Sequence, residues 1–89
     1  MKKANSTRIL GVRIKIEHVP NLTADERILG DADDDTFTIR LDAGLEGDRY
    51  RRVLRHERTH MALRMSGIVE HLDDNTEEAI CRLFEVFRP

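Results

Sequence analysis

The chain has 89 residues, of which 39% are hydrophobic and 36% charged, and its net charge is -2. A chain of this length forms one small domain, and its slight acidity gives no overall attraction to nucleic acid. The single cysteine excludes an internal disulfide framework, and no apolar stretch approaches the roughly 20 residues that span a bilayer. We therefore expect a cytoplasmic protein with one domain over residues 1–89, in which residues 1–8 are flexible.

The first half of the chain predicts a small antiparallel sheet of about three strands. Apolar and polar residues alternate over residues 12–19 until Pro20, as is typical of a half-buried strand. A second alternation covers residues 36–41 and follows the aspartate-rich turn 31–35. Because a short apolar run precedes that turn, we expect a hairpin over about residues 28–41.

The second half predicts two helices. Residues 48–66 carry apolar side chains at intervals of three, four and seven, and Gly67 is expected to cap the C-terminus of that helix. Residues 76–87 form the second helix, whose apolar stripe should face the first helix. The members of this stripe are Ile80, Leu83, Phe84 and Phe87.

The first of these helices carries His56, Glu57 and His60 in the sequence His-Glu-Arg-Thr-His. Two histidines four residues apart project from one face of a helix, so their imidazoles can bind a single zinc ion. The glutamate between them can take a proton from a water molecule that the metal activates. This pattern is typical of zinc metallopeptidases, so we expect Zn2+ as the cofactor and Glu57 as the general base.

Catalytic zinc usually has three protein ligands, so a third ligand is expected. The metzincin pattern is absent, because Leu63 and Ser66 stand where it requires glycine and histidine. The remaining candidates all follow the first helix: His71, Asp73, Asp74, Glu77 and Glu78. Glu77 shares the apolar stripe of the last helix and should point toward the first, so we favour it, with His71 as the main alternative.

Glu78 has another role available to it at the start of the last helix. Asn75 and Glu78 have the spacing of a capping box, although Asp74 and Glu77 would satisfy the same spacing. We therefore interpret Glu78 as a capping residue beside the ligand.

Residues 36–87 resemble the small gluzincin-type metallopeptidases of bacteria, phages and mobile elements. The similar segments are Thr-Phe-Thr-Ile-Arg-Leu, Arg-Val-Leu-Arg-His-Glu-Arg-Thr-His and Asn-Thr-Glu-Glu-Ala-Ile-Cys-Arg-Leu. The resemblance implies a minimal zincin-like α+β fold, with a small antiparallel sheet, an active-site helix and a C-terminal helix that bears a glutamate. It implies zinc bound by His56, His60 and a glutamate three residues before an aliphatic one, which here is Glu77. Arg58 departs from the family pattern, which usually has an aliphatic residue there.

These features predict a zinc-dependent metallopeptidase that hydrolyses peptide or protein substrates. We expect an extended substrate to add to the edge of the strand 36–41 and to contact Thr38, Ile39 and Arg40.

Two other functions remain open: a non-catalytic zincin-fold module that binds a partner protein, and a nucleic-acid-binding protein that uses a basic helix. The arginines of the first helix are Arg49, Arg51, Arg52, Arg55, Arg58 and Arg64. Because the acidic hairpin balances them, we interpret them as a solvated face and expect neither nucleic acid nor a membrane as partner.

The other reactive side chains are interpreted as structural. Tyr50, Cys81, Met61 and Met65 should pack in the interior, because they lie on or beside the apolar stripes of their helices. His18 ends a strand and should lie on the surface.

Overall fold

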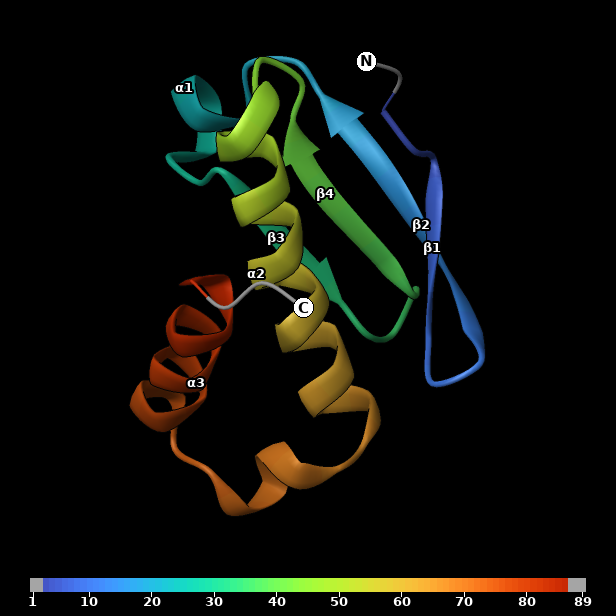
Figure 1. The fold of residues 1–89 in the computed structure, drawn as a ribbon, viewed down its shortest axis with the longest axis vertical. Helices are drawn as coiled ribbons and strands as arrows, with labels where there is room; N and C mark the ends of the chain where they lie inside the picture. The colour runs from blue at the N-terminus through green and yellow to red at the C-terminus, as the bar shows by residue number, and fades with distance from the viewer. Residues whose placement is uncertain (1–2, 87–89) are drawn as a thin grey trace.

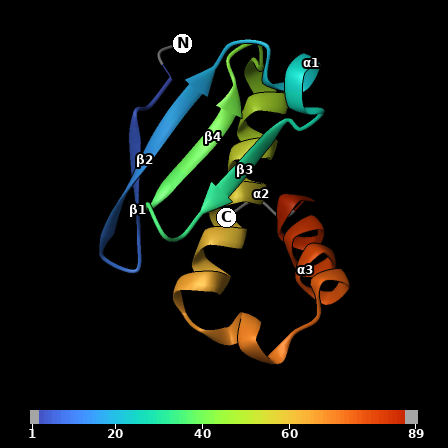
Figure 2. The ribbon, with the colours of Figure 1, turned by 180° about the vertical axis from the view of Figure 1, so that it is seen from behind.

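The computed structural model describes residues 3–86, which form a four-stranded mixed sheet with a long helix across one face (Figures 1 and 2). In chain order the elements are β1 (Ser6–Ile9), β2 (Val12–Val19), α1 (Leu22–Glu26), β3 (Gly30–Asp33), β4 (Thr38–Asp42), α2 (Gly47–Met65), the 3-10 helix η1 (Ile68–His71) and α3 (Asp74–Val86). The predicted α+β class is confirmed. Among the described residues, no helix is long and apolar enough to cross a membrane.

The sheet differs from the prediction in strand number and in direction. Its order is β1-β2-β4-β3, with antiparallel pairs at both sides and a parallel pair, β2 and β4, in the middle. The predicted strand over 12–19 and the hairpin over 28–41 are confirmed. The additional strand β1 pairs with β2 through a tight turn at Leu10 and Gly11, whose φ angles of 51° and 79° fit the primed hairpin turns.

Residues 1–8 were expected to be flexible, and for the part that forms β1 this expectation is wrong. Residues 6–9 pair with residues 12–15 of β2, and Ile9 is buried in the core. Strand pairing orders this segment although its sequence, Ser-Thr-Arg-Ile, has little apolar alternation. Residues 1–2 lie outside the described residues.

The strand that was expected to receive substrate, β4, is an inner strand. Its residues pair with β2 on one side and with β3 on the other, so Thr38, Ile39 and Arg40 have no open backbone edge. The Arg40 guanidinium forms ion pairs with Asp31 and Glu26. The prediction that a substrate adds to β4 is therefore wrong, and within residues 3–86 the edge strands are β1 and β3.

The core lies between the sheet and one face of α2. Alternate residues of β2 and β4 point to this side, as the period of two requires. The buried apolar side chains are Ile9, Ile14, Ile16, Ile39, Leu41, Leu45, Tyr50, Val53 and Met61. Met65 packs against them while partly buried, so the interior positions expected for Tyr50, Met61 and Met65 are confirmed.

Helix α3 packs beside α2 and away from the sheet (Figures 1 and 2). Gly67 follows the end of α2 with a φ of 80°, which confirms the predicted C-terminal glycine. The start of α3 was predicted two residues too late. Its cap is Asp73, whose carboxylate accepts the backbone N–H of Thr76 at 2.6 Å, so the capping box that begins at Asn75 is wrong.

The face that α3 turns toward α2 is not its apolar stripe. Glu77 and Cys81 are buried there, whereas Leu83 and Phe84 are 53% and 51% exposed. The prediction that the apolar stripe faces the first helix is therefore wrong for these two residues, and Phe87 lies outside the described residues. Helix α3 is oriented with its carboxylates toward α2, so they lie opposite the histidines of α2.

Candidate metal centre

His56 and His60 lie one turn apart on α2 and both enter the seam between α2 and α3. Their rings meet edge to face, with centroids 4.9 Å apart and planes at 71°. Their side chains are 15% and 11% exposed, so both imidazoles are largely buried in the seam but remain in contact with solvent. Their position follows from helical periodicity alone, because residues i and i+4 share a face.

The carboxylate of Glu78 bridges the two imidazoles. One oxygen lies 2.9 Å from Nε2 of His56 and the other 3.1 Å from Nε2 of His60. These three residues can offer ligand atoms that all lie within 4.8 Å of one another. Neighbouring ligands of a tetrahedral zinc with bonds near 2.0–2.1 Å are about 3.3 Å apart, so the separations of 2.9 and 3.1 Å from Glu78 to the two imidazoles are close to those of zinc ligands.

The outward nitrogens of the two imidazoles face further carboxylates. Nδ1 of His60 contacts the carboxylate of Glu77, which also pairs with Arg64 at 3.3 Å. Nδ1 of His56 is buried with no hydrogen bond among the described residues, and an oxygen of Glu85 lies 3.5 Å from it. Carboxylates on the far nitrogens are the usual outer partners of histidines that bind metals, since they fix the tautomer and leave Nε2 as the donor atom.

The carboxylate that joins His56 and His60 in the candidate group differs from the one expected. Glu77 does point toward the first helix, as predicted, but it meets the outward nitrogen of His60 and is not in the group that can hold an ion. Glu78 joins that group. Because the helix is capped by Asp73 and not by Asn75, Glu78 is free of the capping role that we had given it.

The other candidates, His71, Asp73 and Asp74, are exposed and lie outside this group. Sequence reasoning also missed Glu85 as a neighbour of His56. The signal was present, because Glu78 and Glu85 are seven residues apart and therefore share one face of a helix.

Glu57 lies between α2 and the edge strand β3. It is 7% exposed, and burial raises the pKa of its carboxyl group, while the neighbouring His56 and His60 oppose that shift. Gly30 of β3 makes this approach possible, since a β-carbon there would lie 3.3 Å from Cγ of Glu57 and 2.7 Å from a backbone oxygen of β4. A carboxyl group beside the imidazoles whose pKa is raised accepts a proton more readily than an ordinary glutamate.

The outer edge of β3 is open beside this carboxyl group. Leu29 accepts the N–H of Asp42 at 2.9 Å, so the antiparallel alternation turns the backbone groups of Gly30 and Ala32 away from β4. The carbonyl of Ala32 accepts a hydrogen bond from Arg64 at 2.7 Å. An extended chain that pairs with β3 would pass along the metal centre, which β4 cannot offer.

The remaining reactive side chains lie outside the seam or are inert. His18, expected on the surface, is half-buried: its Nε2 lies 2.9 Å from the hydroxyl of Tyr50, with burial lowering the pKa of the imidazole. Cys81 is fully buried, as expected, and burial raises the pKa of its thiol to about 12. Neither is placed to act as a metal ligand.

Comparison with protein-family models, with curated proteins and with solved structures finds no match for this chain. The function is therefore inferred from the residues and their geometry.

Proposed function

We propose that this chain is a zinc-dependent peptidase built on a minimal zincin-like domain. His56, His60 and Glu78 would hold the metal, and Glu57 would act as general base. The observation that carries the proposal is the convergence of two imidazole nitrogens and one carboxylate within 4.8 Å, with the buried Glu57 next to His56 on the same helix. The His-Glu-x-x-His pattern and the resemblance to gluzincin-type peptidases support it.

The residues of the seam explain why a cation would bind there. Four carboxylates, those of Glu57, Glu77, Glu78 and Glu85, surround the two imidazoles. A partly buried group of this kind is unfavourable without compensating positive charge. Bound zinc supplies that charge, and it supplies Lewis acidity that makes water a nucleophile at neutral pH.

Glu57 carries the proton in this proposal. Its carboxylate accepts a proton from the attacking water and then donates it to the amine that leaves. The substrate lies extended along the open edge of β3, where the N–H of Ala32 and the backbone groups of Gly30 can pair with it. The edge strand thus replaces β4 as the surface that aligns the scissile peptide.

The experiment measures zinc content and hydrolysis of fluorescently quenched casein for the same set of variants. Purified protein should bind about one equivalent of zinc. His60→Ala should lose both the metal and the activity, whereas Glu57→Gln should keep the metal and lose the activity. A protein that binds no zinc when offered it contradicts the whole proposal, and a Glu57→Gln variant with full activity contradicts the peptidase mechanism.

Glu78→Gln and Glu77→Gln form a matched pair that decides the third ligand. Losing a direct ligand should weaken zinc binding more than losing an outer partner, for which a reduction of about 10- to 100-fold is usual. Glu78→Gln should therefore be the more severe variant. The reverse order would assign the third position to Glu77, as the sequence alone suggested.

A further inference from the structure

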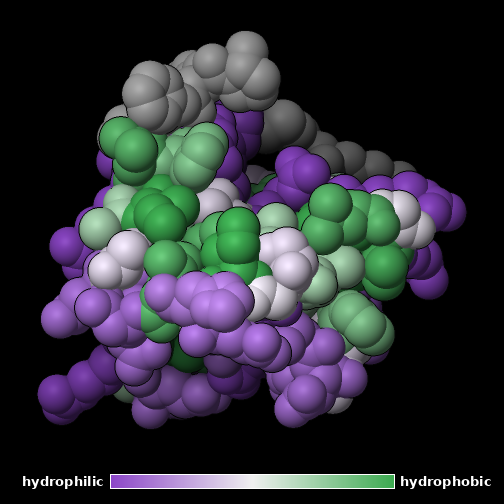
Figure 3. Space-filling model, turned by 90° about the horizontal axis from the view of Figure 1, so that it is seen from below, coloured by the Kyte–Doolittle hydropathy of each residue, from purple (hydrophilic) through white to green (hydrophobic). Residues whose placement is uncertain are grey.

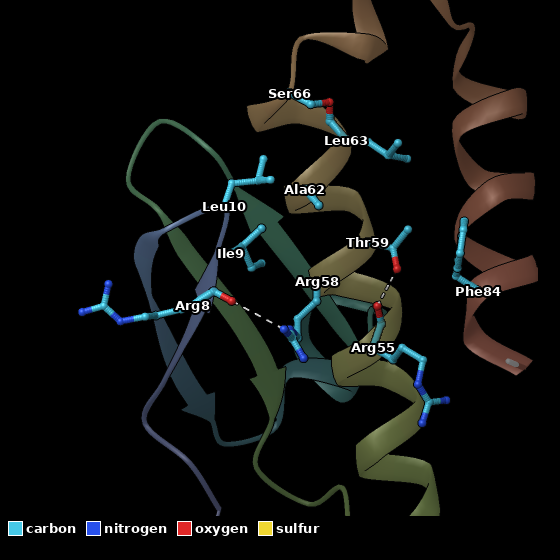
Figure 4. Close-up of a pocket in the computed structure, with 10 residues that line it drawn as sticks. All are labelled: Arg8, Ile9, Leu10, Arg55, Arg58, Thr59, Ala62, Leu63, Ser66 and Phe84. Carbon is cyan, nitrogen blue, oxygen red and sulfur yellow. Dashed lines mark hydrogen bonds between the residues drawn. The ribbon is translucent and has the colours of Figure 1, made fainter. Parts of the chain in front are cut away.

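A groove that the proposed function does not use lies between β1, α2 and α3 (Figure 4). Its volume is about 580 Å³. Its apolar lining includes Leu10 from the first hairpin, Ala62 and Leu63 from α2, and Phe84 from α3. We name it the arginine groove, because Arg8, Arg55 and Arg58 also line it. The imidazoles of the metal centre are not among the residues that line it.

The three arginines of this groove contact backbone carbonyls and no carboxylates. Arg8 donates to the carbonyl of Gly11 at 3.2 Å, Arg58 to the carbonyl of Arg8 at 3.5 Å, and Arg55 to the carbonyl of Glu85 at 2.6 Å. None of them forms an ion pair with an acidic side chain among residues 3–86. This contrasts with Arg40 and Arg64, which pair with carboxylates elsewhere.

The apolar lining of the arginine groove is exposed to an unusual degree. Leu10 is 68% exposed and Phe84 51%. Phe84 and its neighbour Leu83 belong to the stripe that α3 leaves unpaired when its carboxylates turn toward α2. Seen from below, hydrophobic residues gather across this end of the molecule, with hydrophilic residues along their border (Figure 3). Exposed apolar patches bordered by charge often mark interaction surfaces.

Leu10 adds a conformational argument. It has a φ of 51° in the turn between β1 and β2, a position where asparagine or glycine is favoured. A leucine at this position gives up turn stability, and its side chain gains no burial within residues 3–86. Contact with a partner would explain why a large apolar residue stands there.

We propose that the arginine groove binds an acidic amphipathic segment of a partner protein. Its apolar side chains would cover Leu10, Leu63 and Phe84, while its carboxylates would pair with the guanidiniums of Arg55 and Arg58. Charge complementarity selects this occupant, because the guanidiniums of Arg55 and Arg58, which have no acidic partners among residues 3–86, flank an apolar floor, whereas the side chain of Arg8 points away from it (Figure 4). Nucleic acid fits less well, since phosphates would leave Leu10 and Phe84 uncovered.

The probe is a synthetic helical peptide of about 16 residues, with leucine at positions i, i+3, i+4 and i+7 of its repeat and glutamate elsewhere. Binding is followed by fluorescence anisotropy with the purified full chain, both with and without added zinc. The matched peptide carries lysine in place of every glutamate. The glutamate peptide should bind and weaken with added salt, whereas the lysine peptide should not bind.

Two substitutions test the two halves of the surface. Arg58→Glu and Leu10→Asn should each weaken binding of the glutamate peptide by about tenfold, the first by charge and the second by lost apolar contact. Leu10→Asn should fold at least as well as the natural chain, because asparagine tolerates the turn, so loss of binding cannot be ascribed to misfolding. Arg49→Glu, on the same helix but outside the groove, is the control and should change nothing.

Several results would overturn the proposal. Equal binding of the lysine peptide would show a merely hydrophobic surface. Binding of a DNA duplex that Arg58→Glu abolishes, without binding of either peptide, would identify a nucleic-acid interface. Self-association that Arg58→Glu abolishes would identify a second copy as the occupant. Because peptide binding is measured apart from zinc content and hydrolysis, its failure leaves the proposed peptidase function untouched, and the reverse also holds.

Discussion

The two sides of α2 are packed by opposite means. Toward the sheet, Met61 lies in one apolar cluster with fully buried residues such as Ile39 and Leu41, and Glu57 beside Gly30 of β3 is the buried charged group on this side among residues 3–86. Toward α3, His60 meets the carboxylates of Glu77 and Glu78. On the first side, burial of apolar side chains stabilises the fold. On the second side, the buried groups are charged or polar, and burying them stabilises the fold only when they are paired.

Because of this contrast, we expect the two sides of α2 to contribute to stability in different ways. The sheet and α2 have a core that needs no ion, so we expect them to fold whether or not metal is present. The attachment of α3 depends on histidine–carboxylate contacts, which the zinc of the proposed function would complete. Metal binding and the docking of α3 should then be one equilibrium. The stability of the sheet and α2 should be independent of it.

The largest effect should come from the sheet side and should not depend on metal. Ile39→Ala removes a fully buried side chain of the inner strand β4 and should lower the free energy of unfolding by about 2–5 kcal/mol. Urea denaturation with zinc and with chelator should give the same loss. Leu83→Ala, at a half-exposed position, is the control and should lose far less. A loss that zinc abolishes would mean that the core and the seam are not separate.

The next effect concerns the seam and should depend on metal. Cys81 is fully buried in α3, and burial raises the pKa of its thiol to about 12, so it should react with thiol reagents only when α3 opens. Zinc at 100 times its Kd should stabilise the closed seam by about 2.7 kcal/mol and slow labelling by about 100-fold. His60→Ala should label at one rate with or without zinc. Labelling that ignores bound zinc would show that α3 docks without it.

The same contrast explains what the sequence could predict. The period of two in β2 and β4 and the helical period of α2 are direct consequences of packing on an apolar core, and both were predicted correctly. The pairing of β2 with β4 was not, because parallel neighbours are joined through a long connection and leave no local pattern. The strand β1 was missed because its turn carries leucine where asparagine or glycine is the usual signal.

In the candidate metal centre, the sequence located the part that lies on one helix. His56, Glu57 and His60 are fixed relative to one another by helical geometry, and the structure brings them together as expected. Which carboxylate joins the two histidines depends on how α3 is oriented about its axis. Hydrophobic patterning predicts that the apolar stripe of α3 faces α2, and this prediction is valid only where the surface of the facing helix is apolar. Here the facing helix presents histidines, and the carboxylates turn inward to meet them.

A smaller effect should follow from the buried charge of Glu57. Burial raises the pKa of its carboxyl group above the ordinary 4.5, so the folded state binds this proton more tightly than the unfolded state. Stability without metal should therefore fall as pH rises from 4.5 through the raised pKa, and the loss should persist above it. Glu57→Gln should be about 1–2 kcal/mol more stable than the natural chain in chelator at neutral pH, and the difference should vanish below pH 4.5. Denaturation midpoints across this range measure it.

Exposed Glu70 provides the comparison for that experiment. Glu70→Gln changes the net charge by the same amount without changing a buried group, so it should show no such pH dependence. Added zinc should reduce the advantage of Glu57→Gln, because a nearby cation stabilises the ionised carboxylate. An advantage of equal size in zinc and in chelator would place Glu57 too far from the bound ion to act on it.

The smallest effect concerns where α3 begins, and it bears on the choice of the third ligand. Asp73 accepts the backbone N–H of Thr76, so Asp73→Ala should weaken the start of α3 by about 1 kcal/mol. In chelator this should speed the labelling of Cys81 about fivefold, while Asn75→Ala should have almost no effect. If Asn75→Ala were the more harmful change, the helix would begin at the predicted capping box. Glu78 would then be engaged at the cap, and Glu77 would be the carboxylate left for the metal.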